Sequence, residues 1–287
     1  MEHTKNKKYF VEEFKLEEKH YPRIVQITND AFSGHHFEGV GSMFFDIESI
    51  NMFFGSPLLS KCIFVRAVHK ETKEWIGFVA AIPRVLKVKG APREYKAYLV
   101  GFYSIKQKYQ RMSIAKALGR LIIKIGVEKG LDGYIAFFEE EEHGVDAAKS
   151  VSRKTNQPLD SFLKVDNLIL KVLNVNKFSG IVKLKFYEKM GLKLLESVKN
   201  RQNANIRQYL DSDFPQIKEL LEDFSKNNII SLTRDPIDYK WFIENKRVTT
   251  VVHLNKQDKV DGFIAMFKFH LSGFGNIEAI GCIDTIH

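Results

Sequence analysis

The chain has 287 residues, of which 44% are hydrophobic and 28% charged, a composition typical of a folded globular protein rather than a disordered one. No run approaches the roughly 20 apolar residues of a membrane span, and the first residues lack the apolar core of a secretory signal, so neither is predicted. Cys62 and Cys282 are too few for a disulfide framework, which favours a reducing cytoplasm.

The net charge of +9 is spread over lysines that occur singly along the chain. There is no arginine-rich block and no nucleic-acid-binding motif, so a solvated basic surface is a better interpretation than nucleic-acid binding. A basic rim also suits a polyanionic cofactor. His35 and His36 have no Cys or His partners at metal-site spacing, and no metal is predicted.

The first predicted elements are a helix and a β-hairpin. After His20, apolar residues at Ile24, Ile27 and Ala31 fall on one helical face. The apolar run 63–68, a polar turn and the segment 76–83 predict the hairpin. Between them lies the segment 32–60, a loop region in which acceptor specificity is expected. Its two phenylalanine-rich stretches either line an acceptor cleft or belong to the core; they are Met43-Phe44-Phe45 and Met52-Phe53-Phe54.

A strand, a basic turn and a helix follow. The apolar segment 97–105 predicts the strand, and the turn contains Lys106, Lys108 and Arg111. Apolar residues at helical spacing then begin at Ile114. The first turn of such a helix has unpaired N–H groups and the positive end of the helix dipole, and small residues there let a pyrophosphate approach. Further on, 134–138 is predicted as a strand, 143–156 as a helix, 161–175 as a long strand and 177–195 as a connecting helix.

The same order of segments recurs in the second part of the chain. His20-Tyr21-Pro22-Arg23-Ile24 matches Asp213-Phe214-Pro215-Gln216-Ile217, Gly77-Phe78-Val79-Ala80 matches Gly262-Phe263-Ile264-Ala265, and Val100-Gly101 matches Ile280-Gly281. Three matches in order predict an internal repeat. We expect domains at 1–195 and 206–287 with a polar linker between them, and a second copy that stops at its fourth strand, as a truncated chain would.

Three segments resemble a known superfamily. Gln110-x-x-Ser113-x-Ala115 looks like the Q/R-x-x-G-x-G/A motif of the GNAT superfamily of N-acetyltransferases, with Ser113 where glycine is usual. The hairpin segment 76–83 and the opening of the second half are similar to eukaryotic N-myristoyltransferases and related tandem acyltransferases. The resemblance implies an α/β (α+β) fold, with a mixed, mostly antiparallel sheet flanked by helices and a partial second GNAT-like copy.

The resemblance also implies the cofactor and its site. Acetyl-CoA, or another acyl-CoA, would be bound by a strand end and the following loop. The residues concerned are Phe102, Tyr103, Ser104, Ile105, Gln110, Arg111, Met112, Ser113, Ile114 and Ala115. Gly101 lies where a bulge would open the strand.

The catalytic residues are less well defined by the resemblance. Many family members have a glutamate where this chain has Leu99, so the base is sought elsewhere. Glu139 and Glu140, in an acidic run after a predicted strand, either act through water or belong to a solvated loop. Tyr187, in an F-Y-x-x-x-G segment, is a candidate proton donor to the thiolate, although the order of elements argues for a connecting helix.

The predicted function is an acetyl-CoA-dependent N-acyltransferase acting on a primary amine of a small molecule or peptide, cytoplasmic and without membrane or nucleic-acid partners. N-myristoyltransferases use a C-terminal carboxylate as the base, and the second copy is expected to stop before it, so myristoyl transfer is not predicted. The alternative is a non-catalytic CoA-binding or sensing module. Acceptor, acyl-chain length and oligomeric state are left open.

Overall fold

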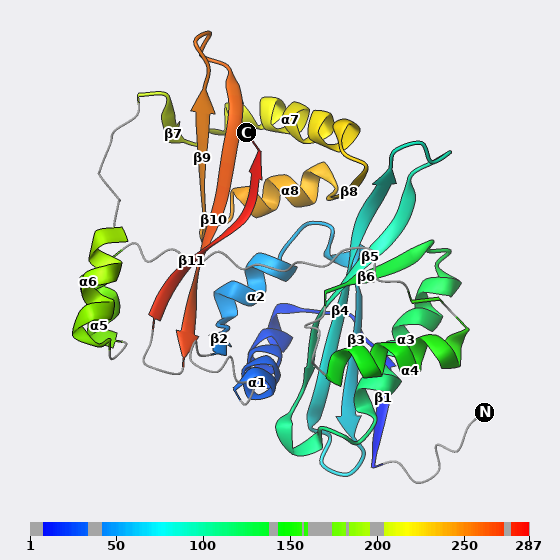
Figure 1. Ribbon diagram of the computed structural model, residues 1–287. Helices are drawn as coiled ribbons and strands as arrows, with labels where there is room; N and C mark the ends of the chain where they lie inside the picture. Colours follow the sequence, from blue (N-terminus) through cyan, green and yellow to red (C-terminus); the bar gives the residue numbers. More distant parts are fainter. Residues whose placement is uncertain are drawn as a thin grey trace.

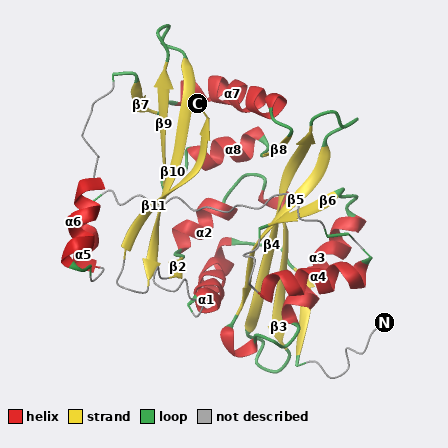
Figure 2. Cartoon of the chain, in the orientation of Figure 1, coloured by secondary structure: helices red, strands yellow, loops and turns green. Residues whose placement is uncertain are grey.

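The computed structural model describes residues 8–33, 42–137, 143–156, 158–159, 174–181, 184–195, 204–272 and 277–286 (Figures 1 and 2). Two sheets lie side by side, each with its own helices. No helix in these ranges is long and apolar enough to cross a membrane.

The first sheet has six strands. The order is β1-β3-β4-β5-β6, and all of these neighbours are antiparallel except β5 and β6, which are parallel. The strands are β1 (Tyr9–Glu13), β3 (Ile63–His69), β4 (Trp75–Val88), β5 (Tyr95–Ile105) and β6 (Gly133–Ala136), with β8 (Ile230–Thr233) paired to the end of β4.

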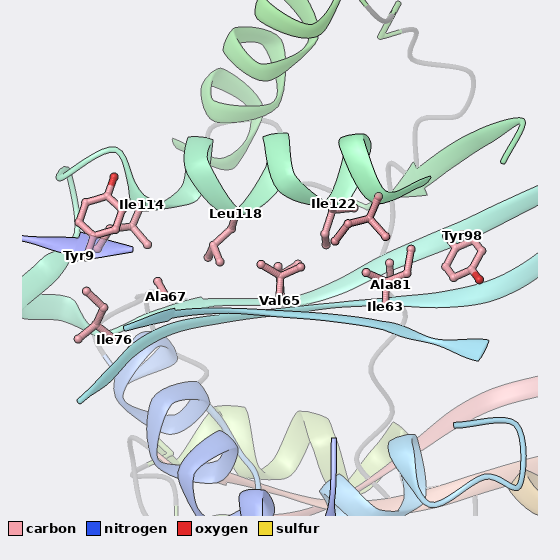
Figure 3. Packing of buried hydrophobic residues seen from close by; sticks show 12 residues of the cluster. Tyr9, Ile63, Val65, Ala67, Ile76, Ala81, Tyr98, Ile114, Leu118 and Ile122 are labelled. Atoms are coloured by element: carbon pink, nitrogen blue, oxygen red, sulfur yellow. The ribbon is translucent and has the colours of Figure 1, made fainter. Parts of the chain in front are cut away.

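Helices cover both faces of this sheet. On one face lies α3 (Ile114–Glu128), against which α4 (His143–Thr155) packs; on the other lie α1 (Tyr21–Phe32) and α2 (Ile47–Phe54). Side chains of α3 point toward the strands in a fully buried layer, with Ile114, Leu118 and Ile122 above Ala67 and Val65 (Figure 3). The helical periodicities predicted for α1 and α3 are therefore confirmed.

The phenylalanine-rich stretches belong largely to the core. Phe45, Met52 and Phe54 are 9%, 2% and 1% exposed, whereas Phe44 is 47% exposed. Of the two alternatives left open by the sequence, core packing holds for these three buried side chains.

The second sheet has the same order of elements as the first: a strand, a helix, a β-hairpin and a further strand. Its strand order is β11-β10-β9-β7, with β2 (Ser42–Phe44) paired to β10. The strands are β7 (Ile206–Gln208), β9 (Val248–Leu254), β10 (Val260–Ser272) and β11 (Ile277–Ile286), and the helices are α7 (Phe214–Asn227) and α8 (Pro236–Ile243). Short 3₁₀ helices, Glu18–His20 and Asp211–Asp213, precede α1 and α7 respectively.

β-Bulges show which residues of the two halves correspond. β4 has one extra residue just before Gly77, and β10 has one extra residue just before Gly262. The bulges therefore lie at the same place in the two segments that the second sequence match aligns. The third match is shifted. Gly101 lies opposite Ala80, whereas the equivalent Ala265 lies opposite Asp284 rather than Gly281. A match of only two residues between apolar strands allows such a slip in a sequence comparison, and only the pairing register resolves it.

The two halves exchange strands. β2, from the first part of the chain, pairs with His270–Ser272 of β10, where β9 has ended. Reciprocally, β8 from the second part pairs with Val85–Val88 of β4, where β3 has ended. Each sheet is therefore completed by the other half.

Side chains reinforce the junction between the halves. Met52 of α2 packs in the core of the second half, among the side chains of α8 and β10. Ion pairs join Arg84 to Asp238 at 3.5 Å and Glu48 to Lys246 at 2.6 Å. The domain boundary predicted at residue 195 stays a prediction. Because Met52 belongs to the core of the second half, the two cores share a side chain.

The connecting region differs in part from expectation. The predicted helix at 143–156 is α4, whereas most of the predicted strand 161–175 lies outside the described residues, and its last residue, Val175, begins a helix instead. The predicted helix 177–195 is two helices, α5 (Val175–Ile181) and α6 (Phe186–Leu195).

Candidate functional site

The end of β5 is paired on one side only. With β4 the pairing reaches Ile105, which lies opposite Gly77. With β6 it covers only Ala97–Val100, and within the described ranges no strand continues along that side of β5. Backbone groups of the segment 101–105 that face this side are therefore available for a ligand.

A bulge re-aims the side chains at this point. Phe102 and Tyr103 together oppose Val79, and Phe102 has a left-handed φ of 55°. Its ring packs against Phe53 and Phe54 at centroid distances of 5.0 and 4.8 Å. A left-handed non-glycine residue is strained, and these ring contacts hold it in place. The bulge expected beside Gly101 is present, one residue further on.

Tyr103 and Ser104 point to opposite faces of the sheet. Tyr103 reaches α3, where its hydroxyl donates to the Ala115 carbonyl, and burial raises the pKa of this phenol. Ser104 is fully buried and its hydroxyl meets that of Thr28 at 3.4 Å. Both side chains fix the strand against helices, which leaves the backbone as the part of this segment that can meet a ligand.

The loop after β5 is tightly wound. A 3₁₀ turn (Gln107–Tyr109) is followed by Arg111 and Ser113, which have φ of 63° and 61°. Turns containing left-handed residues aim backbone N–H groups into a concavity that suits anions. The carbonyl of Met112 accepts from the Tyr9 hydroxyl at 3.2 Å, and that of Ile105 accepts from Gln110 Nε2 at 3.4 Å.

The loop leads into the N-terminus of α3, which has no side-chain cap. The first bond of α3 runs from the N–H of Ala117 to the carbonyl of Ser113 at 3.2 Å, so the N–H groups of 114–116 have no partner within the helix. Ser113 makes no side-chain cap, and the first turn contains no acidic residue. The helix dipole adds partial positive charge here, so the terminus fits a phosphate group.

The cations of the loop are not equivalent. Arg111 is exposed and has no ion-pair partner among the residues that the structure describes. Lys106 and Lys108 instead bind the carboxylate of Glu74, at 2.8 and 3.2 Å. Of the three basic residues expected around the mouth, two therefore anchor the loop, and Arg111 is left to face an anion.

The candidate catalytic residues are not assembled here. Glu139 and Glu140 lie outside the described residues. Tyr187 is 65% exposed on α6, which lies beside the second sheet, on the far side of the molecule from α3 (Figure 1). The structure does not bring Tyr187 to the loop. Leu99 lies within β5, opposite Ile82 and Ile135.

The sequence interpretation missed three residues that hold the loop. Glu74, Asp30 and Tyr9 contact it from 32, 77 and 103 positions away respectively. No local pattern links such distant residues, so only the packing of strands and helices in the folded chain could have indicated them.

Comparisons with known proteins give a fold. No protein-family model and no curated protein matches the sequence. A solved structure of Saccharomyces cerevisiae N-myristoyltransferase with bound myristoyl-CoA has a TM-score of 0.71 at 12% identity, covering 96% of this chain and 62% of that chain. Another, with myristoyl-CoA and inhibitors, has a TM-score of 0.72 at 12% identity, with coverage of 96% and 63%.

A bacterial structure is also similar. A conserved protein of unknown function from Enterococcus faecalis, described as a probable N-acyltransferase, has a TM-score of 0.50 at 11% identity, covering 90% of this chain and 54% of that chain. This chain spans less than two thirds of the length of each of these structures. The predicted fold class is confirmed: the structure has a GNAT-type, mostly antiparallel sheet flanked by helices, followed by a partial second GNAT-like copy.

Proposed function

We propose that the first half of this chain binds an acyl-CoA, and that the protein transfers the acyl group to a primary amine of a small molecule or peptide. The observation that carries the proposal is the uncapped N-terminus of α3, entered through Arg111 and Ser113 in left-handed conformation. It follows the end of β5, which is paired on one side only within the described ranges. The neighbours of the same fold include structures that hold myristoyl-CoA.

The residues present suit such a ligand. N–H groups of 114–116 and the side chain of Arg111 would hold the pyrophosphate, since they offer donors and positive charge without a competing carboxylate in the first helical turn. The free side of 101–105 would hold the extended pantetheine arm by backbone hydrogen bonds. We propose acetyl-CoA, or another acyl-CoA, as the donor.

The chemistry requires few groups from the protein. The bound acyl-CoA supplies an activated thioester. Backbone N–H groups of 102–105 would stabilise the negative charge that develops on its carbonyl oxygen when the amine attacks. The amine loses a proton as the amide bond forms, and the departing thiolate gains one. Glu139 and Glu140 remain our candidates for the first proton transfer, acting through water.

A CoA-binding module without turnover is the second candidate function. It is favoured by Leu99, which cannot accept a proton at the position where many GNAT members have a glutamate. The position of Tyr187, remote from the loop, favours it as well.

The test combines binding and turnover. Calorimetric titration with acetyl-CoA is expected to show one saturable site, and Ser113→Asp is expected to abolish it, because a carboxylate would face the pyrophosphate. Asn156→Asp is the matched control, since Asn156 also has a left-handed φ of 53° and also gains one negative charge, but lies at the end of α4.

The outcomes separate the candidates. Acetyl transfer to any member of a panel of amines supports the enzyme. Saturable binding without transfer favours the binding module. If the wild-type protein binds no acetyl-CoA, both are refuted, and if Ser113→Asp binds normally, the loop assignment is wrong.

A further inference from the structure

A carboxylate from the turn between β3 and β4 binds the first part of the candidate phosphate loop. Glu74, one residue before β4, accepts hydrogen bonds from Lys106 Nζ at 2.8 Å, Lys108 Nζ at 3.2 Å and the Tyr109 hydroxyl at 3.0 Å. These contacts join the turn between β3 and β4 to the whole 3₁₀ turn after β5. The Lys106 hydrogen bond is the largest of the effects that hold the pKa of Glu74 near 2, so the side chain is ionised at neutral pH.

The opposite side of the turn is anchored too. Asp30 Oδ2, at the end of α1, accepts from the backbone N–H of Gln107 at 2.8 Å, and Ser33 Oγ accepts from Gln107 Nε2 at 3.2 Å. The turn is thus held between two elements that are themselves fixed by the core. Since Arg111 lies two residues after this turn and Ser113 four, the turn sets where the left-handed residues begin.

Electrostatics alone does not explain Glu74. A carboxylate near a polyanionic ligand repels it, and Glu74 also binds two lysines that would otherwise attract it. The side chain of Lys106 is only 9% exposed and lies against the Glu74 carboxylate. The negative charge of Glu74 therefore lowers the affinity for an acyl-CoA. The side chain can raise that affinity only by holding the loop in a geometry that binds the ligand.

We propose that Glu74 is a positioning residue for the candidate phosphate loop: it clamps Lys106, Lys108 and Tyr109 so that the N–H groups at the start of α3 are preorganised for the acyl-CoA. This inference rests on the proposed function. It assigns an affinity role to a carboxylate that binds side chains of the turn after β5 rather than the N–H groups at the start of α3.

The charge of Glu74 should weaken acyl-CoA binding, whereas its positioning of the loop should strengthen it, and the test separates these two effects. Glu74→Gln removes the charge and most of the clamp, and Glu74→Asp keeps the charge but is one methylene too short to reach all three partners. Glu71→Gln is the control, because Glu71 is exposed in the same turn. Acetyl-CoA binding is measured by calorimetry on the full chain at two ionic strengths, and thermal unfolding confirms that each variant is folded.

Positioning predicts weaker binding for both Glu74 variants, by roughly 10-fold for Gln, the scale of a modest displacement of binding groups. If turnover is observed, KM should rise with kcat largely kept. Glu71→Gln should bind as tightly as the wild type, or slightly more tightly at low salt.

The inference is overturned if Glu74→Gln binds as tightly as the wild type or more tightly, or if a folded Glu74→Asp is unchanged. A wild-type protein that binds no acetyl-CoA would instead refute the proposed function. The two failures are thus distinguishable.

Discussion

Ser113 occupies a backbone conformation that favours glycine, and replacing it with glycine should stabilise the protein. Its φ of 61° and ψ of 18° are left-handed, and its hydroxyl makes no cap to the helix that follows. A side chain in this conformation costs about 1–2 kcal/mol, because Cβ approaches the following carbonyl. Glycine removes that cost but loses about 0.5–1 kcal/mol more backbone entropy on folding. We expect Ser113→Gly to raise the free energy of unfolding by about 0.5–1 kcal/mol.

The measurement is urea-induced unfolding, supported by thermal denaturation, where the gain corresponds to a rise in Tm of roughly 1–4 °C. Ser113→Ala is the control, because it removes the hydroxyl but keeps Cβ. Its free energy of unfolding should stay within about 0.5 kcal/mol of the wild type. Acetyl-CoA affinity should be kept or increased in Ser113→Gly, since the loop keeps all of its backbone N–H donors, to which we assign the pyrophosphate.

Two results would refute this reasoning. If Ser113→Gly is less stable than Ser113→Ala, the residue is not strained by its backbone conformation. If the glycine variant is more stable but loses acetyl-CoA affinity, the hydroxyl itself contacts the ligand, and the motif departs from the GNAT pattern for a functional reason.

Three further predictions follow from packing and charge. Gly126→Ala should destabilise the protein by about 1–3 kcal/mol, despite the better helix propensity of alanine, because the new Cβ would lie 1.6 Å from the Tyr134 hydroxyl. Gly191→Ala, whose Cβ would meet no atom of the described residues within 4 Å, should be neutral or stabilising in the same unfolding assay. A fragment ending at residue 195 should unfold at lower denaturant than the whole chain or aggregate, since it lacks β8 and exposes the face of α2 that packs on the second half, and equal midpoints would contradict the strand exchange. The folded-state pKa of Glu74 is lowered to about 2, so its stabilising effect is present above the ordinary value of 4.5 and is lost as pH falls toward 2. Unfolding titrations across that interval should show a steeper loss for the wild type than for Glu74→Gln, and parallel curves would contradict the clamp.

Local sequence determined most of the individual elements. The apolar spacing of Ile24, Ile27 and Ala31 was enough to predict α1. A helix that buries one face repeats its apolar residues every three or four positions, whatever that face packs against. The basic turn followed by an amphipathic run sufficed for the loop and α3. Matching segments in the two halves indicated a partial second copy, because equivalent elements bury equivalent positions.

The tertiary structure decided what the elements do together. The exchange of β2 and β8 could not be predicted, because a short strand has no signal for the sheet it joins, and its partners depend on where a neighbouring strand ends. Two of the three loop cations are bound by Glu74, a residue that becomes their neighbour only when β4 and β5 pair. Charge in a sequence is therefore a poor guide to charge at a site, since a distant carboxylate can neutralise a cation that local sequence leaves free.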